Sequence, residues 1–314
     1  MLFGIRDCFD YLECDNCGVL QLMNIPKDLN KYYPSSYYSY LNTSGLINKT
    51  INYFLYKMYD YTIFDKSLLG KNLLKFDSED KFFTVNQIGK LIKQLLDSRD
   101  FNKDSYVLDV GCGAGQFLEI FDKLGFKNLY GIDISVEDNK SNINFIESTL
   151  DSYDTNLKFD LIFLNDSFEH MDNQLENMEH LKYLLKEKGR IILTMPLKSY
   201  TYEKYGSNWY ALDAPRHFYI HTLKSFKILL NTVGFEIEDI IFNSNVTSFV
   251  RSEEYKNNIP ENDKKAYKEE WRIFFNMTNL RKSIFDKYQI IKFKNKVKEL
   301  DKKNLGDHAI FVLK

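Results

Sequence analysis

Residues 107–118 read VLDVGCGAGQFL, and this stretch decides the fold. An apolar run ends at Val110, glycines follow at positions 111, 113 and 115, and a helical pattern then begins. Glycine adopts positive φ and lets the backbone approach a ligand closely, and the start of a helix offers unpaired N–H donors. A strand, a glycine turn and a helix in this order therefore predict a ligand-binding turn.

The next strand in the sequence adds an acid to this turn. Residues 130–133 read YGID, so Asp133 ends the strand about twenty residues after the glycines, where a ribose diol would be bound. A dinucleotide fingerprint would have its third glycine at Gln116, three residues beyond the second. Because Gly115 gives an alternating pattern instead, a nicotinamide-dependent oxidoreductase is the disfavoured alternative.

Short apolar runs alternate with amphipathic stretches through the rest of this region. That alternation predicts a parallel sheet covered by helices on both faces. The chain ends in one more apolar run, and residues 250–304 before it are charged and amphipathic, which indicates helices. The predicted strands are 106–110, 128–132, 143–146, 161–164, 190–195, 236–242 and 308–313.

The run from Val107 to Ser135 resembles the first two motifs of class I S-adenosylmethionine (SAM)-dependent methyltransferases. FDLIFLNDSFEHM at 159–171 and GRIILTMP at 189–196 resemble the motifs of the fourth and fifth strands, and residues 208–240 resemble the segment before the sixth in the small-molecule branch. The resemblance implies an α/β, Rossmann-like sheet of seven strands with the last antiparallel. SAM is the cofactor that it implies.

The resemblance also assigns roles around SAM. Asp109, Gly111, Cys112, Gly113 and Gly115 would surround its methionine part. Asp133 would bind the ribose, and Ile134 would lie beside the adenine. Thr149 stands where the family often has an acid facing the adenine amine, and Asn165 would offer a backbone contact to the methionine amine.

An acid–histidine cluster follows the fourth strand, at the edge of the sheet where ligands bind. If a helix begins here, Asp166, Glu169 and His170 share one face. Three interpretations stay open: Glu169 and His170 cap a helix and fix loops, His170 is a general base for a hydroxyl, or the three residues bind Mg²⁺ or Mn²⁺. Ubiquinone-pathway O-methyltransferases show a similar metal cluster.

A second candidate group surrounds Pro215-Arg216-His217, which the resemblance places beside the substrate pocket. His217 is either catalytic or makes a structural hydrogen bond to a neighbouring loop. His221 is interpreted as a residue that precedes the helix beginning after Thr222.

The N-terminal segment holds Cys14-x-x-Cys17, half of a zinc ribbon, and a tyrosine-rich stretch. It resembles a methyltransferase subgroup with an N-terminal Cys₄ module, whose other cysteine pair precedes the part matched here. Since closure needs four ligands, we do not expect zinc to be bound. Tyr38 would close over SAM, as similar aromatic residues do in that subgroup, or pack hydrophobically.

Composition bounds the remaining possibilities. The formal net charge of -2 gives no field that would attract nucleic acid, and no apolar run reaches the ~18 residues of a membrane span. The 4 cysteines and the absence of a signal-peptide pattern favour the cytoplasm. The oligomeric state is left open.

These observations divide the chain and suggest its activity. We expect O-methylation of a small molecule, such as a sugar or nucleotide-sugar of a bacterial surface glycan; C- or N-methylation and a non-catalytic SAM-binding protein are the alternatives. The expected segments are a Cys/Tyr-rich segment (1–44), a helical lead-in (45–100), the SAM-binding core (101–245), a helical acceptor lid (246–304) and the final core strand (305–314).

Overall fold

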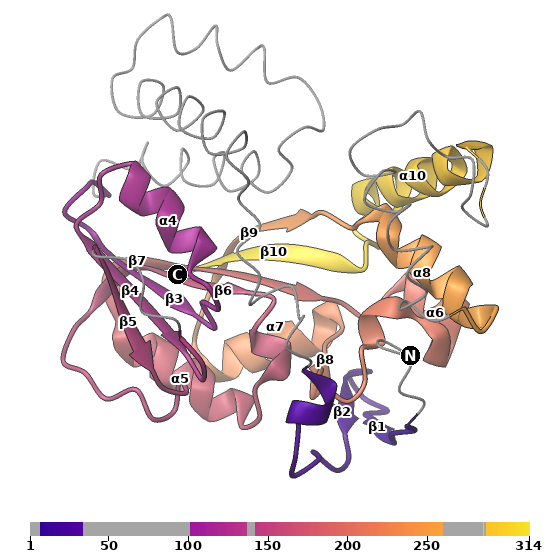
Figure 1. The fold of residues 1–314 in the computed structure, drawn as a ribbon, viewed down its shortest axis with the longest axis horizontal. Coiled ribbons are helices and arrows are strands. Elements are labelled where there is room, and N and C mark those ends of the chain that lie inside the picture. Colours follow the sequence, from indigo (N-terminus) through magenta and orange to yellow (C-terminus); the bar gives the residue numbers. More distant parts are fainter. Residues whose placement is uncertain (1–6, 34–100, 137–141, 260–284, 286) are drawn as a thin grey trace, which may run out of the picture. The chain divides into compact units, whose positions relative to one another are not determined.

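The computed structural model of the protein describes residues 7–33, 101–136, 142–259, 285 and 287–314. Its strands form two sheets, and helices follow them along the chain (Figure 1). The predicted helical segment at 45–100 and the predicted role of Tyr38 lie outside the described residues.

The larger sheet has seven strands in the order β5-β4-β3-β6-β7-β10-β9. The pairs β3–β4, β3–β6 and β4–β5 are parallel, whereas β10 is antiparallel to both β7 and β9. The predicted fold class, a mixed sheet with an antiparallel last strand, is confirmed. The strands are β3 (Tyr106–Val110), β4 (Asn128–Asp133), β5 (Ile143–Glu147), β6 (Phe159–Asn165), β7 (Leu185–Pro196), β9 (Ile237–Phe242) and β10 (His308–Leu313).

One compact unit contains residues 101–136, 142–163 and 183–190 of the described chain. Its glycine turn connects β3 to helix α4 (Gln116–Lys123) and packs against β4. A Cβ atom added to Gly131 would lie 2.8 Å from Cys112 Sγ and 2.9 Å from Leu118 Cδ1. Because such contacts are too close for any side chain, the glycine in YGID allows β4 to lie directly behind the turn.

The other compact unit contains residues 7–33, 164–182, 191–259, 285 and 287–314 of the described chain. It includes a second sheet, of order β1-β2-β8, formed by Tyr11–Glu13, Leu20–Leu22 and Tyr219–Ile220. Figure 1 shows the indigo hairpin β1–β2 beside β8. The α-helices that begin in this unit are α5 (Gln174–Leu184), α6 (Tyr200–Tyr205), α7 (Leu223–Val233), α8 (Val246–Lys256) and α10 (Lys287–Lys302), and short 3₁₀ helices cover Asn30–Tyr32, Phe168–His170, Gly206–Asn208 and Tyr210–Leu212.

Helices α8 and α10 lie in the segment predicted to be a helical insertion. Phe249 of α8 and Val297 and Leu300 of α10 form one buried cluster with Trp209. The insertion therefore shares a core with the segment before β8. None of the helices in the described ranges is long and apolar enough to cross a lipid bilayer.

Candidate active site

The glycine turn after β3 has the backbone that its sequence predicts. Gly111, Gly113 and Gly115 take φ values of 74°, 49° and 66°, in the left-handed region where other residues are strained. Gly115 is also the N-cap of α4, so the turn leads directly into the N-terminus of a helix. That end of a helix favours polar and anionic ligand groups.

Asp133 ends β4 and lies against this turn. Its Oδ2 accepts a hydrogen bond from the backbone N of Gly113 at 2.9 Å, and its Oδ1 accepts one from the backbone N of Ser135 at 3.1 Å. Each carboxylate oxygen has two lone pairs, so the two oxygens of Asp133 can still accept hydrogen bonds from two hydroxyl groups. Ile134 beside it is 67% exposed, and Thr149 after β5 is also exposed. A ribose and an adenine fit these groups.

Asp109 and Cys112 form the buried side of the turn. Their exposed fractions are 3% and 8%. Burial, together with the charge of Asp133, raises the pKa of Asp109 to about 7. Near neutral pH this side chain is therefore present both as a hydrogen-bond donor and as an acceptor.

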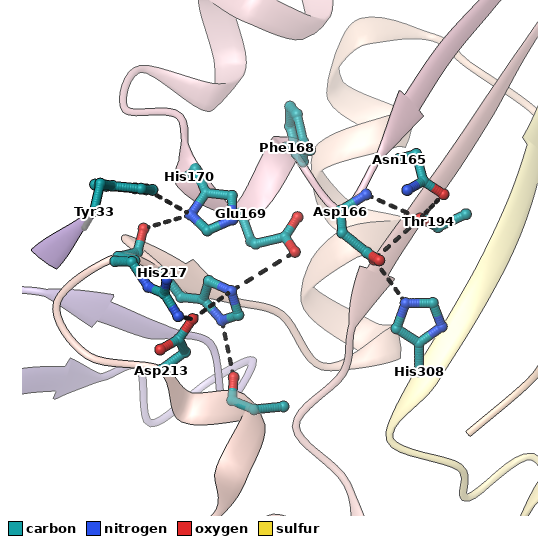
Figure 2. A network of polar contacts seen from close by, with 12 residues as sticks. Tyr33, Asn165, Asp166, Phe168, Glu169, His170, Thr194, Asp213, His217 and His308 are labelled. Atoms are coloured by element: carbon teal, nitrogen blue, oxygen red, sulfur yellow. Dashed lines mark hydrogen bonds and ion pairs between the residues drawn. The ribbon is translucent and has the colours of Figure 1, made fainter. Parts of the chain in front are cut away.

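The exit of β6 differs from the sequence prediction. The helix that would place Asp166, Glu169 and His170 on one face does not begin at Asp166, because Asp166 has a φ of 49° and a 3₁₀ turn at Phe168–His170 follows. Asp166 instead turns toward His308 and Thr194 (Figure 2), with its Oδ1 2.7 Å from His308 Nε2 and 3.0 Å from Thr194 Oγ1. It does not share a face with Glu169 and His170. Asn165, the last residue of β6, is exposed.

Asp166 and His308 form an ion pair. Burial alone would lower the pKa of His308, but the carboxylate of Asp166 raises it above the ordinary value. The Nδ1 of His308 also lies 2.6 Å from Asn243 Oδ1, so both ring nitrogens face oxygen acceptors. This arrangement favours the imidazolium form.

Glu169 is a buried carboxyl group with unused hydrogen-bonding capacity. Its exposed fraction is 2%, and its Oε2 has no hydrogen-bond partner among the described residues. Burial, followed by repulsion from Asp166, raises its pKa well above the ordinary value for glutamate. Burial thus favours the neutral form of Glu169, which can donate one hydrogen bond.

His170 is held in one tautomer by the backbone. Its Nδ1 lies 2.8 Å from the carbonyl oxygen of Arg216 and 3.3 Å from the hydroxyl of Tyr33. Since a carbonyl can only accept, Nδ1 carries the proton and Nε2 keeps its lone pair. Burial lowers the pKa of His170, so the ring is neutral near pH 7.

His217 is held in the same way. Its Nδ1 donates to the carbonyl oxygen of Ala211 at 2.8 Å, and its Nε2 lies 3.8 Å from both Glu169 Oε1 and Asp213 Oδ2. Burial, reinforced by His170, lowers its pKa to about 3. The Arg216 guanidinium is bonded to Asp213, which balances the charge of that carboxylate beside the two imidazoles.

Glu169, His170 and His217 thus form the site that the structure brings together, and Figure 2 shows the three side chains side by side. One ligand atom from each lies within 4.8 Å of the others. Among the described residues, these three have the spacing of metal ligands. The set contains His217 where Asp166 was predicted as the third ligand. Two imidazole nitrogens and a carboxylate suit a divalent transition metal better than Mg²⁺. The same atoms also suit a substrate hydroxyl.

Several residues of this site were not predicted. Asp213 stands three residues before Arg216, and this spacing of an acid and a base is the one local pattern that could have indicated their ion pair. Tyr33 and His308 come from opposite ends of the chain, 137 and 142 positions from their partners His170 and Asp166. No local pattern in the sequence connects such residues.

Comparison with known proteins identifies the class. A family described as "Methyltransferase domain" matches residues 81–240, just over half of the chain. The chain belongs to this family, and its recognition as a class I SAM-dependent methyltransferase is confirmed. SAM is the methyl donor of that class.

Individual relatives match more narrowly. A malonyl-[acyl-carrier protein] O-methyltransferase of Ilyobacter polytropus is 31% identical over 172 residues, which is 48% of this chain and 62% of the relative. A mitochondrial ubiquinone biosynthesis O-methyltransferase of Dictyostelium discoideum is 26% identical over 116 residues, which is 30% and 36%. The chain thus spans less than two thirds of the curated relatives that it matches.

A solved structure of similar fold is a putative sarcosine dimethylglycine methyltransferase from Galdieria sulphuraria. The two chains are 16% identical, with a TM-score of 0.47, over 73% of this chain and 85% of that chain.

Proposed function

We propose that this protein transfers the methyl group of SAM to a hydroxyl oxygen of a small molecule. The observation that carries the proposal is the clustering of two histidines, each bound through Nδ1 to a backbone carbonyl and presenting Nε2, with the buried carboxyl group of Glu169. Burial favours the neutral form of all three groups. Such groups accept and donate hydrogen bonds to a neutral hydroxyl. When bound, SAM supplies the methyl group through its sulfonium.

The cofactor would be held by the glycine turn and its acids. In this proposal Asp109, Gly111, Cys112, Gly113 and Gly115 surround the methionine part, as expected from the sequence. Asp133 binds the ribose, because its carboxylate lies at the turn with acceptor capacity left. The remaining predicted contacts are Ile134 and Thr149 with the adenine and Asn165 and Tyr38 with the rest of SAM.

His170 is the better candidate for the general base. Efficient bases have a pKa near the working pH, and the pKa of His217 is depressed to about 3. His170 is less completely buried, and its Nε2 would take the hydroxyl proton as the oxygen–methyl bond forms and the sulfur–methyl bond breaks. Glu169 and His217 would then bind and orient the acceptor.

The charge of the site argues for a hydroxyl and against a carboxylate acceptor. A bound carboxylate would need a cation, but the Arg216 guanidinium beside the histidines is already paired with Asp213. A carboxylate acceptor would also lie next to the buried Glu169, and the two acids would repel each other unless Glu169 stayed protonated. One relative is named a malonyl-[acyl-carrier protein] O-methyltransferase and another a ubiquinone biosynthesis O-methyltransferase, so the screen below includes more than one class of acceptor.

A metal-assisted form of the same reaction is the second candidate, favoured by the donor spacing of Glu169, His170 and His217. A divalent cation there would polarise the acceptor hydroxyl. It would also displace the proton of Glu169, because a coordinating carboxylate must be ionised. We further propose that the acceptor is a sugar or nucleotide-sugar and that the protein acts in the cytoplasm. The choice of acceptor rests on the resemblance of the N-terminal segment.

The test is a screen with labelled SAM and the full chain. The panel contains nucleotide-sugars, phenols and a malonyl thioester, each with and without a chelator. Methylation of an alcohol or phenol that survives chelation supports the base mechanism, and loss on chelation supports the metal. Methylation of the malonyl carboxylate, or of nitrogen or carbon acceptors alone, would overturn the proposal; SAM binding with no turnover on any acceptor would favour a non-catalytic protein.

A further inference from the structure

We propose that His308 is a positioning residue for methyl transfer, because its hydrogen bond to Asp166 holds the chain after β6 in the left-handed turn that places Glu169 and His170. His308 is the first residue of the last strand, β10, and lies 142 positions from Asp166. All four residues belong to one compact unit of the chain. The inference rests on the proposed function in one respect, since Glu169 and His170 are taken there to contact the acceptor.

The backbone at Asp166 needs to be held from outside. Its φ of 49° lies in the left-handed region, where a residue with a Cβ atom is strained. Ser167 returns to a φ of -127°, and the 3₁₀ turn at Phe168–His170 begins directly after it. The direction in which this turn leaves the sheet is therefore set at Asp166. Strained conformations of this kind persist only where surrounding contacts fix them.

Contacts from two strands fix Asp166 at the edge of the sheet (Figure 2). β7 lies between β6 and β10, so the Asp166 carboxylate reaches across β7 to His308, with 2.7 Å between its Oδ1 and the ring Nε2. The hydroxyl oxygen of Thr194 on β7 lies 3.0 Å from the same Oδ1 and accepts a hydrogen bond from the Asp166 backbone N at 2.9 Å. Both the side chain and the backbone of Asp166 are thus tied to neighbouring strands.

The ring of His308 is itself held on its other side. Its Nδ1 lies 2.6 Å from Asn243 Oδ1, and the Asn243 backbone N donates to the carbonyl oxygen of His308 at 3.1 Å. Both ring nitrogens therefore face oxygen acceptors. Asn243 orients the ring, and the ring presents its Nε2–H to Asp166.

The turn that begins here carries the groups of the proposed site. Only three positions separate Asp166 from Glu169, and His170 follows directly. A shift of the chain at Asp166 would therefore move both groups relative to the acceptor, and misplacement by about 1 Å can cost about 10²-fold in rate. Phe168, which is buried in the middle of the turn and packs against Phe226, is the competing anchor.

The activity test compares His308→Leu, which makes neither hydrogen bond, with His308→Gln, whose amide can still donate to Asp166. In the full chain, His308→Leu should lower kcat about 10–100-fold on the acceptor found by the screen. The KM for that acceptor and the affinity for SAM should stay within about twofold of wild type, which also shows that the variant is folded. His308→Gln should recover most of the loss, and His180→Gln, on α5, is the matched control.

Hydrogen–deuterium exchange tests the hold on the turn without any acceptor. The amides of His170 and Met171 close the turn by donating to Ser167 O and Phe168 O, at 3.2 Å and 3.1 Å. Both amides should exchange about tenfold faster in His308→Leu than in wild type, as expected for the loss of about one net hydrogen bond. In His308→Gln they should exchange at nearly the wild-type rate.

The two measurements separate this inference from the proposed function. Unchanged exchange in His308→Leu would overturn the inference and leave the packing of Phe168 as the anchor of the turn. Faster exchange with wild-type kcat would overturn it as well, because the turn would then not position the reacting groups. If the wild type methylates no acceptor, the proposed function fails, whereas the exchange rates still decide whether His308 holds the turn. If His308→Leu does not fold, Asp166→Ala removes the same contact from β6 and should speed exchange of the same two amides by a similar factor.

Discussion

The glycine turn and the histidine cluster hold their polar groups in different ways. In the turn, Gly113 and Asp133 lie twenty positions apart and meet through a backbone N–H. In the cluster, His170 comes from the 3₁₀ turn after β6 and His217 from the segment before β8, and each is fixed by a backbone carbonyl of the segment 211–216. The turn is built from local backbone geometry, whereas the cluster depends on tertiary packing of buried side chains.

This difference has a chemical consequence. The acid at the end of β4 stays partly exposed, whereas burial raises the pKa of Glu169 and lowers the pKa of both histidines. In the proposed function the turn would bind the charged cofactor and the cluster would bind a neutral hydroxyl. Each prediction below changes one of the two regions and leaves the other as a control.

The largest effect is expected for His170→Ala. Removing a general base lowers turnover by about 10²–10⁴-fold, and the affinity for SAM should be unchanged because the variant leaves the glycine turn intact. Single-turnover kinetics and calorimetry with SAM measure the two quantities. His180→Ala, on α5 and outside the cluster, is the matched histidine control. Wild-type turnover by His170→Ala would show that positioning alone carries the reaction.

Acid should destabilise the folded protein through His217 of the cluster. The pKa of His217 falls from 6.5 to about 3 on folding, so its contribution to stability is present above pH 6.5 and is lost as the pH falls toward 3. In His217→Gln this part of the pH dependence, on the order of several kcal/mol, should disappear. Urea unfolding of both proteins between pH 7 and pH 4 provides the measurement. Parallel pH profiles for the two proteins would contradict the buried neutral histidine.

A smaller effect is expected at the turn. Asp133→Ala should weaken SAM binding by about 1.5–3 kcal/mol, the usual contribution of a hydrogen bond to a charged group. Asp133→Asn is the matched variant, because its amide oxygen can still accept from Gly113 N while the charge is lost. Calorimetry should rank the affinities as wild type, then Asn, then Ala. Equal affinities for all three proteins would remove Asp133 from the ribose site.

The two regions also differ in what the sequence could predict. The strand β3 was predicted with its observed bounds, and the glycine turn and the end of β4 followed from local rules about φ and strand periodicity. Glu169, His170 and His217 were each predicted as candidate catalytic residues, but no sequence pattern placed His217 beside the other two. The candidate metal ligands were Asp166, Glu169 and His170, which would share one face only if a helix began there.

The reason for that error is physical. Asp166 adopts a φ of 49° and pairs with His308, which lies 142 positions away on the last strand. A helical pattern at residues 166–170 cannot reveal that competing ion pair, because the pair exists only after β10 is in place. Likewise, the hydrogen bonds from His170 and His217 to backbone carbonyls depend on loop conformations that no residue pattern specifies.

The smallest effect is expected for Glu169→Gln, and it separates the two mechanisms most directly. If the Glu169 carboxyl is neutral, an amide of the same shape can still donate a hydrogen bond, so turnover at pH 7 should change by no more than about threefold. A metal at Glu169, His170 and His217 would need the ionised carboxylate, and the same variant would then lose nearly all activity. Stability gives an independent check on the charge. Because the pKa of Glu169 is raised on folding, its contribution is complete below pH 4.5 and declines as the pH rises toward the folded value. Glu169→Gln should therefore gain stability relative to wild type as the pH is raised, as measured by urea unfolding, and a gain that runs in the opposite direction would mean that the carboxylate is charged in the folded protein.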